Sequence, residues 1–252
     1  MGRQIKTFLS NWIKAFLYPI PILGILYLPK FAYQCFKFSK MAKGDFKPRF
    51  RDLHPCLLDS VSSTPFDPHY FYQGAWLARK LQESKPLKHI DVGSSVLMIG
   101  VISAQVDTTF VDYRPLKASL KGLDAIGGDI LDLPFPNDAV RSLSCLHVLE
   151  HIGLGRYGDK LDVHGSQKGA SQLERVLESG GSLYVSVPIG AERICFNAHR
   201  VFDTKKFPRL FDGLKLKSFS YVDDVGMFHE NSSPEDVPLL DYGCGFFHFT
   251  KP

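Results

Sequence analysis

One stretch, residues 128–157, constrains the fold of this chain more than any other. It reads GDILDLPFPNDAVRSLSCLHVLEHIGLGRY. Its residues 139–146 are rich in small and apolar side chains, and the polar residues His147, Glu150 and His151 follow. A buried strand with polar side chains after its C-terminal end is how an open α/β sheet builds a ligand site. We therefore expect an α/β sheet with a site at this edge.

Acidic residues stand at the ends of three earlier predicted strands. These strands and their acids are residues 87–92 with Asp91, residues 108–111 with Asp112, and residues 123–127 with Asp129. Gly93 follows the first strand and would let a ligand approach the backbone, while the carboxylate of Asp112 suits ribose hydroxyls. Three carboxylates along one edge indicate a nucleotide site. The alternative is that each acid only caps its own turn.

Further strands and helices complete the predicted sheet. The expected strands are residues 139–146, 182–187, 214–221 and 245–250, which makes seven in all. The expected helices begin at Pro68, with Asp67 as N-cap, and cover residues 96–106, 113–121, 165–178 and 204–211. Asp at the N-cap and Pro at the first helical position are favourable there.

Charge divides the chain. Residues 1–44 contain seven Lys or Arg and no acid, whereas residues 45–252 carry 23 basic and 26 acidic residues. Residues 15–28 are uncharged, but this run is shorter than the roughly 20 residues that span a bilayer. We predict a membrane-surface segment that places Trp12, Phe16 and Tyr18 at the interface. The alternatives are an arm that packs on the domain or on a second subunit, and an uncleaved signal or re-entrant segment.

These patterns predict three regions: a basic, apolar arm at residues 1–44, a proline-rich linker or lid at residues 45–69, and a catalytic-type domain at residues 70–252. The five cysteines are scattered without a CxxC pair, which favours a reducing compartment. We expect a cytoplasmic protein, peripheral at the inner face of the membrane. The slightly acidic domain has no basic stripe and argues against a nucleic-acid partner.

Several strings resemble a known family. GDILDLPFPND, HVLEHIG and LERVLESGGSLYVSVP are similar to the middle of class I methyltransferases that use S-adenosylmethionine. The strings HYFYQGAWLARK, EHIGLGRYGD, FNAHRVF and YGCGFF resemble one branch, the methyltransferase-like family called domain of unknown function 268. The resemblance begins near residue 66 and implies a Rossmann-like sheet of seven strands whose last strand is antiparallel.

The resemblance also implies S-adenosylmethionine as the cofactor. It places Asp91, Gly93 and Ser94 near the methionine part and Asp112 on the ribose. The adenine would lie against Asp129 and Ile130, and His147 completes the expected cofactor set. The first turn reads GSSVL where these enzymes have GxGxG. The larger side chains are therefore expected to crowd the methionine part.

A glycine-rich loop and two histidines complete the predicted site. The loop residues Arg156, Tyr157 and Asp159 are expected to contact the acceptor, as are Asn197 and Arg200. His151 and His199 are the candidate general bases, because an imidazole titrates near neutral pH. Each of these residues has a structural alternative, as a turn residue or a buried, hydrogen-bonded histidine.

Three functions follow from these patterns. The first is methyl transfer from S-adenosylmethionine to a small-molecule or glycan acceptor, with large losses expected from mutating Asp112 and modest ones from His151 or His199. The second is a binding or scaffold protein with the same fold and no turnover, which the missing glycines favour. The third is a metal hydrolase, because His147 to His151 reads HxxEH, whose histidines would share one face of a helix. In the first two cases no metal is expected.

Overall fold

The structure is a computed structural model and describes residues 22–252. The chain divides into two compact units, residues 1–65 and residues 66–252. Trp12, Phe16 and Tyr18 lie outside the described residues, and so do residues 1–21 of the predicted membrane segment.

The described part of the first unit is helical. It contains the 3-10 helix η1 (Ile22–Tyr27), the helix α2 (Leu28–Met41), and two single 3-10 turns, η2 (Gly44–Phe46) and η3 (Phe50–Asp52). None of the side chains of α2 is buried. Among residues 22–252, no helix combines the length and hydropathy that crossing a membrane requires.

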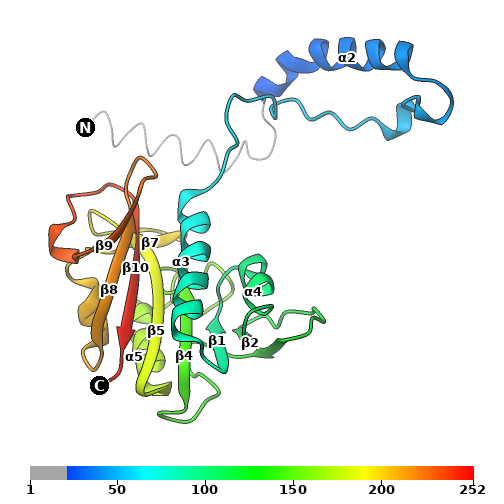
Figure 1. The fold of residues 1–252 in the computed structure, drawn as a ribbon. Coiled ribbons are helices and arrows are strands. Elements are labelled where there is room, and N and C mark those ends of the chain that lie inside the picture. The colour runs from blue at the N-terminus through cyan, green and yellow to red at the C-terminus, as the bar shows by residue number, and fades with distance from the viewer. Residues whose placement is uncertain (1–21) are drawn as a thin grey trace. The chain divides into compact units, whose positions relative to one another are not determined.

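The second unit alternates strands and helices (Figure 1). Its elements in chain order are α3 (Pro68–Ser84), β1 (Lys88–Val92), α4 (Val96–Ile102), β2 (Asp107–Asp112), β3 (Leu123–Gly127), β4 (Val140–Leu146), α5 (Gly165–Val176), β5 (Leu177–Ile189), β6 (Arg193–Cys195), β7 (His199–Val201), η4 (Phe207–Phe211), β8 (Lys215–Val222), β9 (Phe228–Ser232), η5 (Pro234–Asp236) and β10 (Gly243–Thr250).

Eight of these strands form one mixed sheet, in the order β3-β2-β1-β4-β5-β10-β8-β9. The first five run parallel, whereas β10 pairs antiparallel with both β5 and β8. The predicted α/β class and the antiparallel last strand are confirmed. The predicted count of seven strands is wrong, because β9 adds an antiparallel edge strand next to β8. Strands β6 and β7 form a separate two-stranded hairpin.

Two apolar cores cover the two faces of this sheet. On one face, α5 and η4 contribute Leu173 and Phe207 to a core that includes Phe247 of β10. On the other, α3 and α4 contribute Trp76 and Ile102 to a core that includes the neighbouring Phe246. Successive side chains of a strand point to opposite faces, so β10 supplies both cores.

Three local predictions differ from the structure. Residues 113–121 form no helix, because Asp112 accepts a hydrogen bond from the backbone N–H of Arg114 and a turn follows. The predicted helix at residues 204–211 is the 3-10 helix η4 alone. Helix α5 ends at Val176, two residues early, and β5 begins at once. The predicted N-cap of α3 is confirmed: Asp67 accepts from the N–H of His69 at 2.9 Å.

Candidate functional site

A cavity of about 390 Å³ lies where β1, β2, β3 and β4 end. Residues that directly follow these four strands form most of its lining: Gly93, Asp112, Tyr113, Arg114, Gly128, Asp129, Ile130, Leu131, His147 and Val148. The loop at residues 151–160 closes another side. Because parallel strands end at the same edge of the sheet, residues far apart in the sequence meet here.

Asp112 presents a free carboxylate oxygen to this cavity. Its Oδ1 accepts a hydrogen bond from the N–H of Arg114 at 2.7 Å, which fixes the side chain. No described residue donates to its Oδ2, and that atom would lie 3.9 Å from a Cβ placed on Gly93. An anchored carboxylate with one unused oxygen can accept hydrogen bonds from a ligand's hydroxyl groups.

Gly93 has little room for a side chain. Its backbone has φ of +70°, in the left-handed region that favours glycine. A Cβ there would lie 3.3 Å from both methyl groups of Val148. Glycine at this position therefore keeps side-chain atoms out of this part of the cavity.

Neither Asp91 nor Ser94 lines the cavity. Asp91 accepts from the N–H of Ser94 at 3.0 Å, from its Oγ at 2.7 Å, and from the Oγ of Ser144 on β4. The Oγ of Ser94 accepts in turn from the N–H of Leu146 at 2.9 Å. Burial raises the pKa of Asp91 to about 6. These residues therefore tie the end of β1 to β4 and shape the turn.

The expected crowding of the cavity by the GSSVL turn is not observed. The side chain of Ser94 points into the sheet, and neither Ser95 nor Leu97 lines the cavity. Leu97 instead is largely exposed. Ser95 and Leu97 stand where GxGxG has its second and third glycine, and their side chains leave the cavity open.

Asp129 and Ile130 line the cavity beyond β3. Asp129 Oδ1 accepts from the N–H of Leu131 at 2.8 Å, so the carboxylate is fixed by its own turn. Behind them, Gly169 of α5 brings Leu149 and Ile130 against the helix. The sequence prediction for both residues therefore agrees with their location.

A second, smaller and more polar pocket of about 130 Å³ adjoins the first. Its lining consists of Asp67, His69, Tyr70, His147, Glu150, His151, Arg156, Tyr157, His199 and Tyr242. His147, His151 and Tyr157 line both pockets. The two pockets therefore share a wall, which is the arrangement that a two-substrate site requires.

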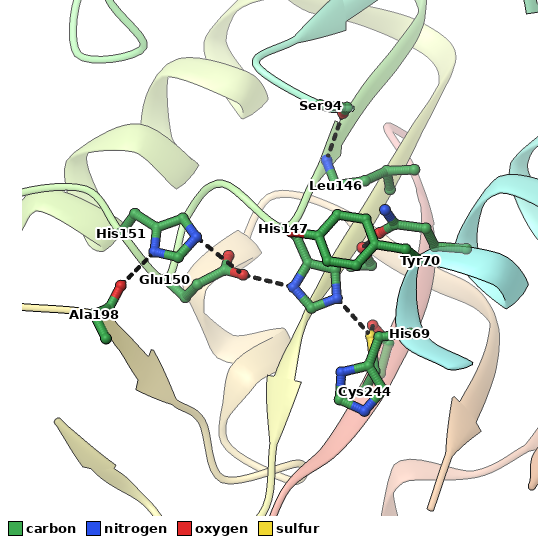
Figure 2. A network of polar contacts seen from close by, with 12 residues as sticks. His69, Tyr70, Ser94, Leu146, His147, Glu150, His151, Ala198 and Cys244 are labelled. Carbon is green, nitrogen blue, oxygen red and sulfur yellow. Dashed lines mark hydrogen bonds and ion pairs between the residues drawn. The ribbon is translucent and has the colours of Figure 1, made fainter. Parts of the chain in front are cut away.

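His147 is at the centre of a buried polar network (Figure 2). Its Nδ1 lies 2.7 Å from Glu150 Oε1, and its Nε2 lies 3.2 Å from Cys244 Sγ on β10. Its backbone φ is +55°, an unfavourable value that turns the ring away from β4. Burial alone would lower the pKa of His147, but the neighbouring Cys244 and Glu150 raise it well above its usual value. Burial raises the pKa of the Cys244 thiol.

Glu150 is buried and only partly satisfied. Its side chain is 1% exposed, and its Oε2 has no hydrogen-bond partner among the described residues. A buried carboxylate oxygen without a donor is costly. Glu150 also lines the polar pocket.

His151 lies between the two pockets, and its tautomer follows from its contacts. Its Nδ1 lies 2.7 Å from the carbonyl oxygen of Ala198, which can only accept, so Nδ1 carries the hydrogen. Its Nε2 lies 3.8 Å from Glu150 Oε1. Burial lowers the pKa of His151, which leaves Nε2 as an unprotonated base near neutral pH.

The other candidate bases and loop residues have different positions. His199 lines the polar pocket beside Tyr242, and burial lowers its pKa. Arg156 donates to the carbonyl oxygen of Ala198 at 3.0 Å and lines the polar pocket. Tyr157 lines both pockets, with its ring between the guanidinium groups of Arg114 and Arg156 at 4.9 and 5.1 Å.

Three predicted substrate residues have other contacts. Asp159 lines the larger cavity, but it accepts from the N–H groups of Gly153, Gly155 and Tyr157 and so holds the loop together. Arg200 donates to the carbonyl oxygen of Ile152 at 2.6 Å and lines neither pocket. Asn197 is exposed and also lines neither. For Arg200 and Asn197, the structure does not support a direct contact with substrate.

The predicted HxxEH helix is wrong. Residues 147–155 form turns, so His147 and His151 do not share a helical face. His147 turns toward Cys244 and His151 toward Ala198. The geometry on which the hydrolase alternative depends is therefore absent.

The sequence analysis missed His69, Tyr70, Tyr242 and Cys244. His69 and Tyr70 belong to an aromatic cluster at the start of α3 whose sequence is typical of a hydrophobic core. Tyr242 directly precedes β10, and Cys244 is its second residue. A usable signal was that His69 and Tyr70 directly follow the N-cap, where side chains point beyond the helix end.

Comparison with known proteins supports the fold. No curated protein matches this sequence. Residues 137–232 match a family model described as Caenorhabditis protein of unknown function, DUF268, which confirms the predicted resemblance. Among solved structures, a putative sarcosine dimethylglycine methyltransferase from Galdieria sulphuraria is 15% identical, with a TM-score of 0.53 over 72% of this chain and 86% of that one. The fold is that of a class I methyltransferase.

Two further solved structures are similar to this chain. N-methyltransferase NodS from Bradyrhizobium japonicum WM9, in complex with S-adenosyl-L-homocysteine, is 12% identical, with a TM-score of 0.52 over 74% of this chain and 89% of NodS. The YcgJ protein from Bacillus subtilis is 11% identical, with a TM-score of 0.50 over 72% of this chain and 98% of that one. At these identities the likeness bears on the fold alone.

Proposed function

We propose that this protein is an S-adenosylmethionine-dependent methyltransferase that acts on a small, polar acceptor. The observation that carries the proposal is the pair of adjoining pockets at the strand ends. The larger has a nucleotide-type lining with the free oxygen of Asp112, and the smaller is polar and is lined by four histidines. In the fold of class I methyltransferases, this edge of the sheet is the ligand edge.

The residues present fit S-adenosylmethionine. Asp112 Oδ2 is free to accept from the ribose hydroxyls, and Asp129 with the backbone of Ile130 would hold the adenine. Gly93 leaves space for the methionine part, and the Ser94 side chain is held inside the sheet. A volume of about 390 Å³ falls in the range of small-molecule sites.

When bound, S-adenosylmethionine would supply an activated methyl group to the acceptor. The chain contributes alignment of the acceptor and removal of its proton. His151 Nε2 faces the pockets as a neutral base and can take the proton of a hydroxyl or amine. Glu150 Oε1, 3.8 Å away, then stabilises the resulting imidazolium.

The polar pocket favours an acceptor that carries hydroxyl groups, such as a sugar. Tyr70, Tyr157 and Tyr242 supply ring faces and hydroxyls, and Arg156 supplies fixed donors. His199 is the alternative base in the same pocket. A scaffold protein without turnover remains the second candidate, because a cofactor pocket can persist without catalysis.

Calorimetric titration of the full chain with S-adenosylmethionine and S-adenosylhomocysteine tests the proposal. We expect saturable binding that Asp112→Ala weakens at least about tenfold, since hydrogen bonds to a charged group contribute about 1.5–3 kcal/mol. Asp107→Ala is the matched control, because Asp107 lies at the other end of the same strand and is exposed. It should bind both ligands like the wild type.

The outcomes separate the candidates. If the folded chain binds neither ligand, the methyltransferase and its cofactor assignment are both wrong. Binding that Asp112→Ala and Asp107→Ala leave equally unchanged contradicts the assigned site. Binding without any S-adenosylhomocysteine formation across a panel of sugars, amines and phenols favours the scaffold.

For residues 1–44 we propose contact with an anionic membrane surface, carried by the amphipathic pattern of α2. At 100° per residue, Leu28, Phe31, Cys35, Phe36 and Phe38 fall on one face, whereas Tyr33 and Met41 fall on the other. Lys30, Lys37 and Lys40 also fall on the other, and the helix has no acid. A helix with an apolar face and a lysine-rich polar face is suited to lie in a membrane interface.

A further inference from the structure

Three side chains from distant parts of the sequence bring metal-binding atoms together. They are His69 in the first turn of α3, His147 after β4, and Cys244 in β10, and one donor atom of each lies within 4.8 Å of the other two. Cys244 and the side chain of His147 are buried, and His69 is partly buried. Two imidazoles and one thiolate are a donor set that Zn²⁺ accepts in proteins.

The spacing needs only a small adjustment to hold an ion. In a tetrahedral site, a zinc–nitrogen distance of about 2.0 Å and a zinc–sulfur distance of about 2.3 Å place the two donors roughly 3.5 Å apart. His147 Nε2 and Cys244 Sγ already lie 3.2 Å apart. His69 begins at the N-terminus of a helix that Asp67 caps, so its backbone is fixed while its side chain can rotate.

Glu150 orients His147 as the residue behind a metal ligand does. His147 Nδ1 donates to Glu150 Oε1 at 2.7 Å, which directs Nε2 toward the sulfur (Figure 2). A carboxylate that fixes the tautomer and orientation of a ligating histidine is a recurrent feature of zinc sites. This hydrogen bond has no part in the proposed methyl transfer, but it would orient His147 as a metal ligand.

The charge of the buried network also favours a cation. Glu150 is 1% exposed, and its Oε2 has no partner among the described residues. A divalent ion bound by His147 would lie near this carboxylate and offset the cost of its burial. The carboxylate lies on the Nδ1 side of the His147 ring and the other two ligands lie on its Nε2 side, so the charge acts on the ion through this ring.

We propose that His69, His147 and Cys244 form a Zn²⁺ site whose fourth position opens on the polar pocket. His69 and His147 both line that pocket, so a water molecule or the acceptor could take the remaining position. Binding displaces the thiol proton of Cys244 and the proton on His147 Nε2, and both pass to the solvent. The site differs from the HxxEH arrangement, since His151 has no part in it. It goes beyond the proposed methyl transfer and does not depend on it.

The experiment uses the full chain, stripped with a chelator and reloaded with one equivalent of Zn²⁺ or Co²⁺. Elemental analysis after desalting measures bound zinc, and the absorption spectrum of the Co²⁺ form reports its ligands. We expect one zinc per chain. We also expect visible bands of tetrahedral Co²⁺ and a thiolate-to-cobalt charge-transfer band in the near ultraviolet.

Variants assign the ligands. Cys244→Ser should lose the charge-transfer band, and His69→Ala should lose bound zinc. Cys195→Ser is the matched control, because Cys195 lies in the β6–β7 hairpin outside the cluster, and it should retain both signals. Glu150→Gln should weaken zinc affinity 10–100-fold while leaving the charge-transfer band in place, as expected for a residue that positions a ligand.

Each contrary result overturns the proposal. A folded wild-type chain that retains no zinc has no such site, and this result does not depend on whether any variant folds. A charge-transfer band that survives in Cys244→Ser, or that disappears in Cys195→Ser, assigns the thiolate elsewhere. Because metal binding is measured without S-adenosylmethionine, failure here leaves the cofactor titration as a separate result.

Discussion

A buried chain of polar side chains, centred on His89 of β1, joins the neighbouring strands β1 and β4 beneath the site. His89 Nδ1 lies 2.8 Å from the Oγ of Ser142, and its Nε2 lies 2.8 Å from the Oγ of Ser144. Ser144 in turn donates to Asp91. Both ring nitrogens of His89 therefore have a hydrogen-bond partner when the ring is neutral. Burial lowers the pKa of His89 to about 3 and raises that of Asp91 to about 6.

These two groups should give the stability of the protein opposing pH dependences. His89 takes up a proton in the unfolded chain near pH 6.5 but not in the folded one, so its contribution is lost as pH falls from 6.5 toward 3. Asp91 holds its proton more tightly when folded. Its contribution is present below pH 3.8 and is lost as pH rises through about 6.

The substitution His89→Gln removes the pH dependence of stability that comes from His89. The stability advantage of the wild type over this variant should shrink by about 1.4 kcal/mol per pH unit as pH falls from 6.5 to 4.5. Urea unfolding of both proteins at several pH values measures this difference, and common groups cancel in it. A difference that stays constant across this range would contradict a neutral, buried His89.

Two glycines in helices have opposite roles at the level of the elements. Gly100 lies inside α4 with nothing within 4 Å of a Cβ, whereas a Cβ on Gly169 of α5 would lie 3.0 Å from Leu149 and 3.5 Å from Ile130. Gly169 thus lets α5 approach the loop that carries the site. At Gly100, by contrast, no neighbouring group would be displaced by a side chain.

Alanine at these two positions should therefore change stability in opposite directions. Gly100→Ala should stabilise the protein by about 0.5–1 kcal/mol, because alanine is the better helix former. Gly169→Ala gains the same propensity but must displace Leu149, so we expect a net loss of about 1–3 kcal/mol. Denaturant unfolding measures both. Equal effects of the two substitutions would mean that the contact at Gly169 is easily relieved.

At the scale of the whole molecule, both pockets and the proposed zinc ligands belong to residues 66–252. The described part of the first unit contributes no residue to them. Cofactor binding and membrane contact should therefore be separable by mutation.

Replacing Lys30, Lys37 and Lys40 by Gln tests this separation in the full chain. Each lysine near an anionic surface contributes about 1 kcal/mol, so the triple variant should bind anionic vesicles roughly 100-fold more weakly. Flotation measures vesicle binding, and calorimetry should give an unchanged affinity for S-adenosylhomocysteine. Replacement of three exposed lysines of the second unit, Lys121, Lys215 and Lys217, is the control. If it lowers flotation equally, the arm is not the membrane contact.

Much of the fold was predictable because it depends on local patterns. Asp67 and Pro68 predicted the start of α3, and the apolar runs predicted most strands at close to their observed bounds. The exception is β5, which begins at Leu177, five residues before the predicted strand. The edge strand β9 was missed because its sequence, FHENS, is polar and half exposed. An edge strand on an antiparallel sheet needs no continuous apolar pattern.

The sequence by itself determined that Gly93, Asp112, Asp129 and His147 would share one edge, because parallel strands place their C-terminal ends together. Only the tertiary structure decided what each side chain does there. Asp91 and Ser94 turn into the sheet, while Cys244 and His69, more than 170 residues apart in the chain, meet at His147. Strand periodicity reports which face a residue takes, but a contact between distant segments depends on strand order and register. Those are set by packing of the whole sheet.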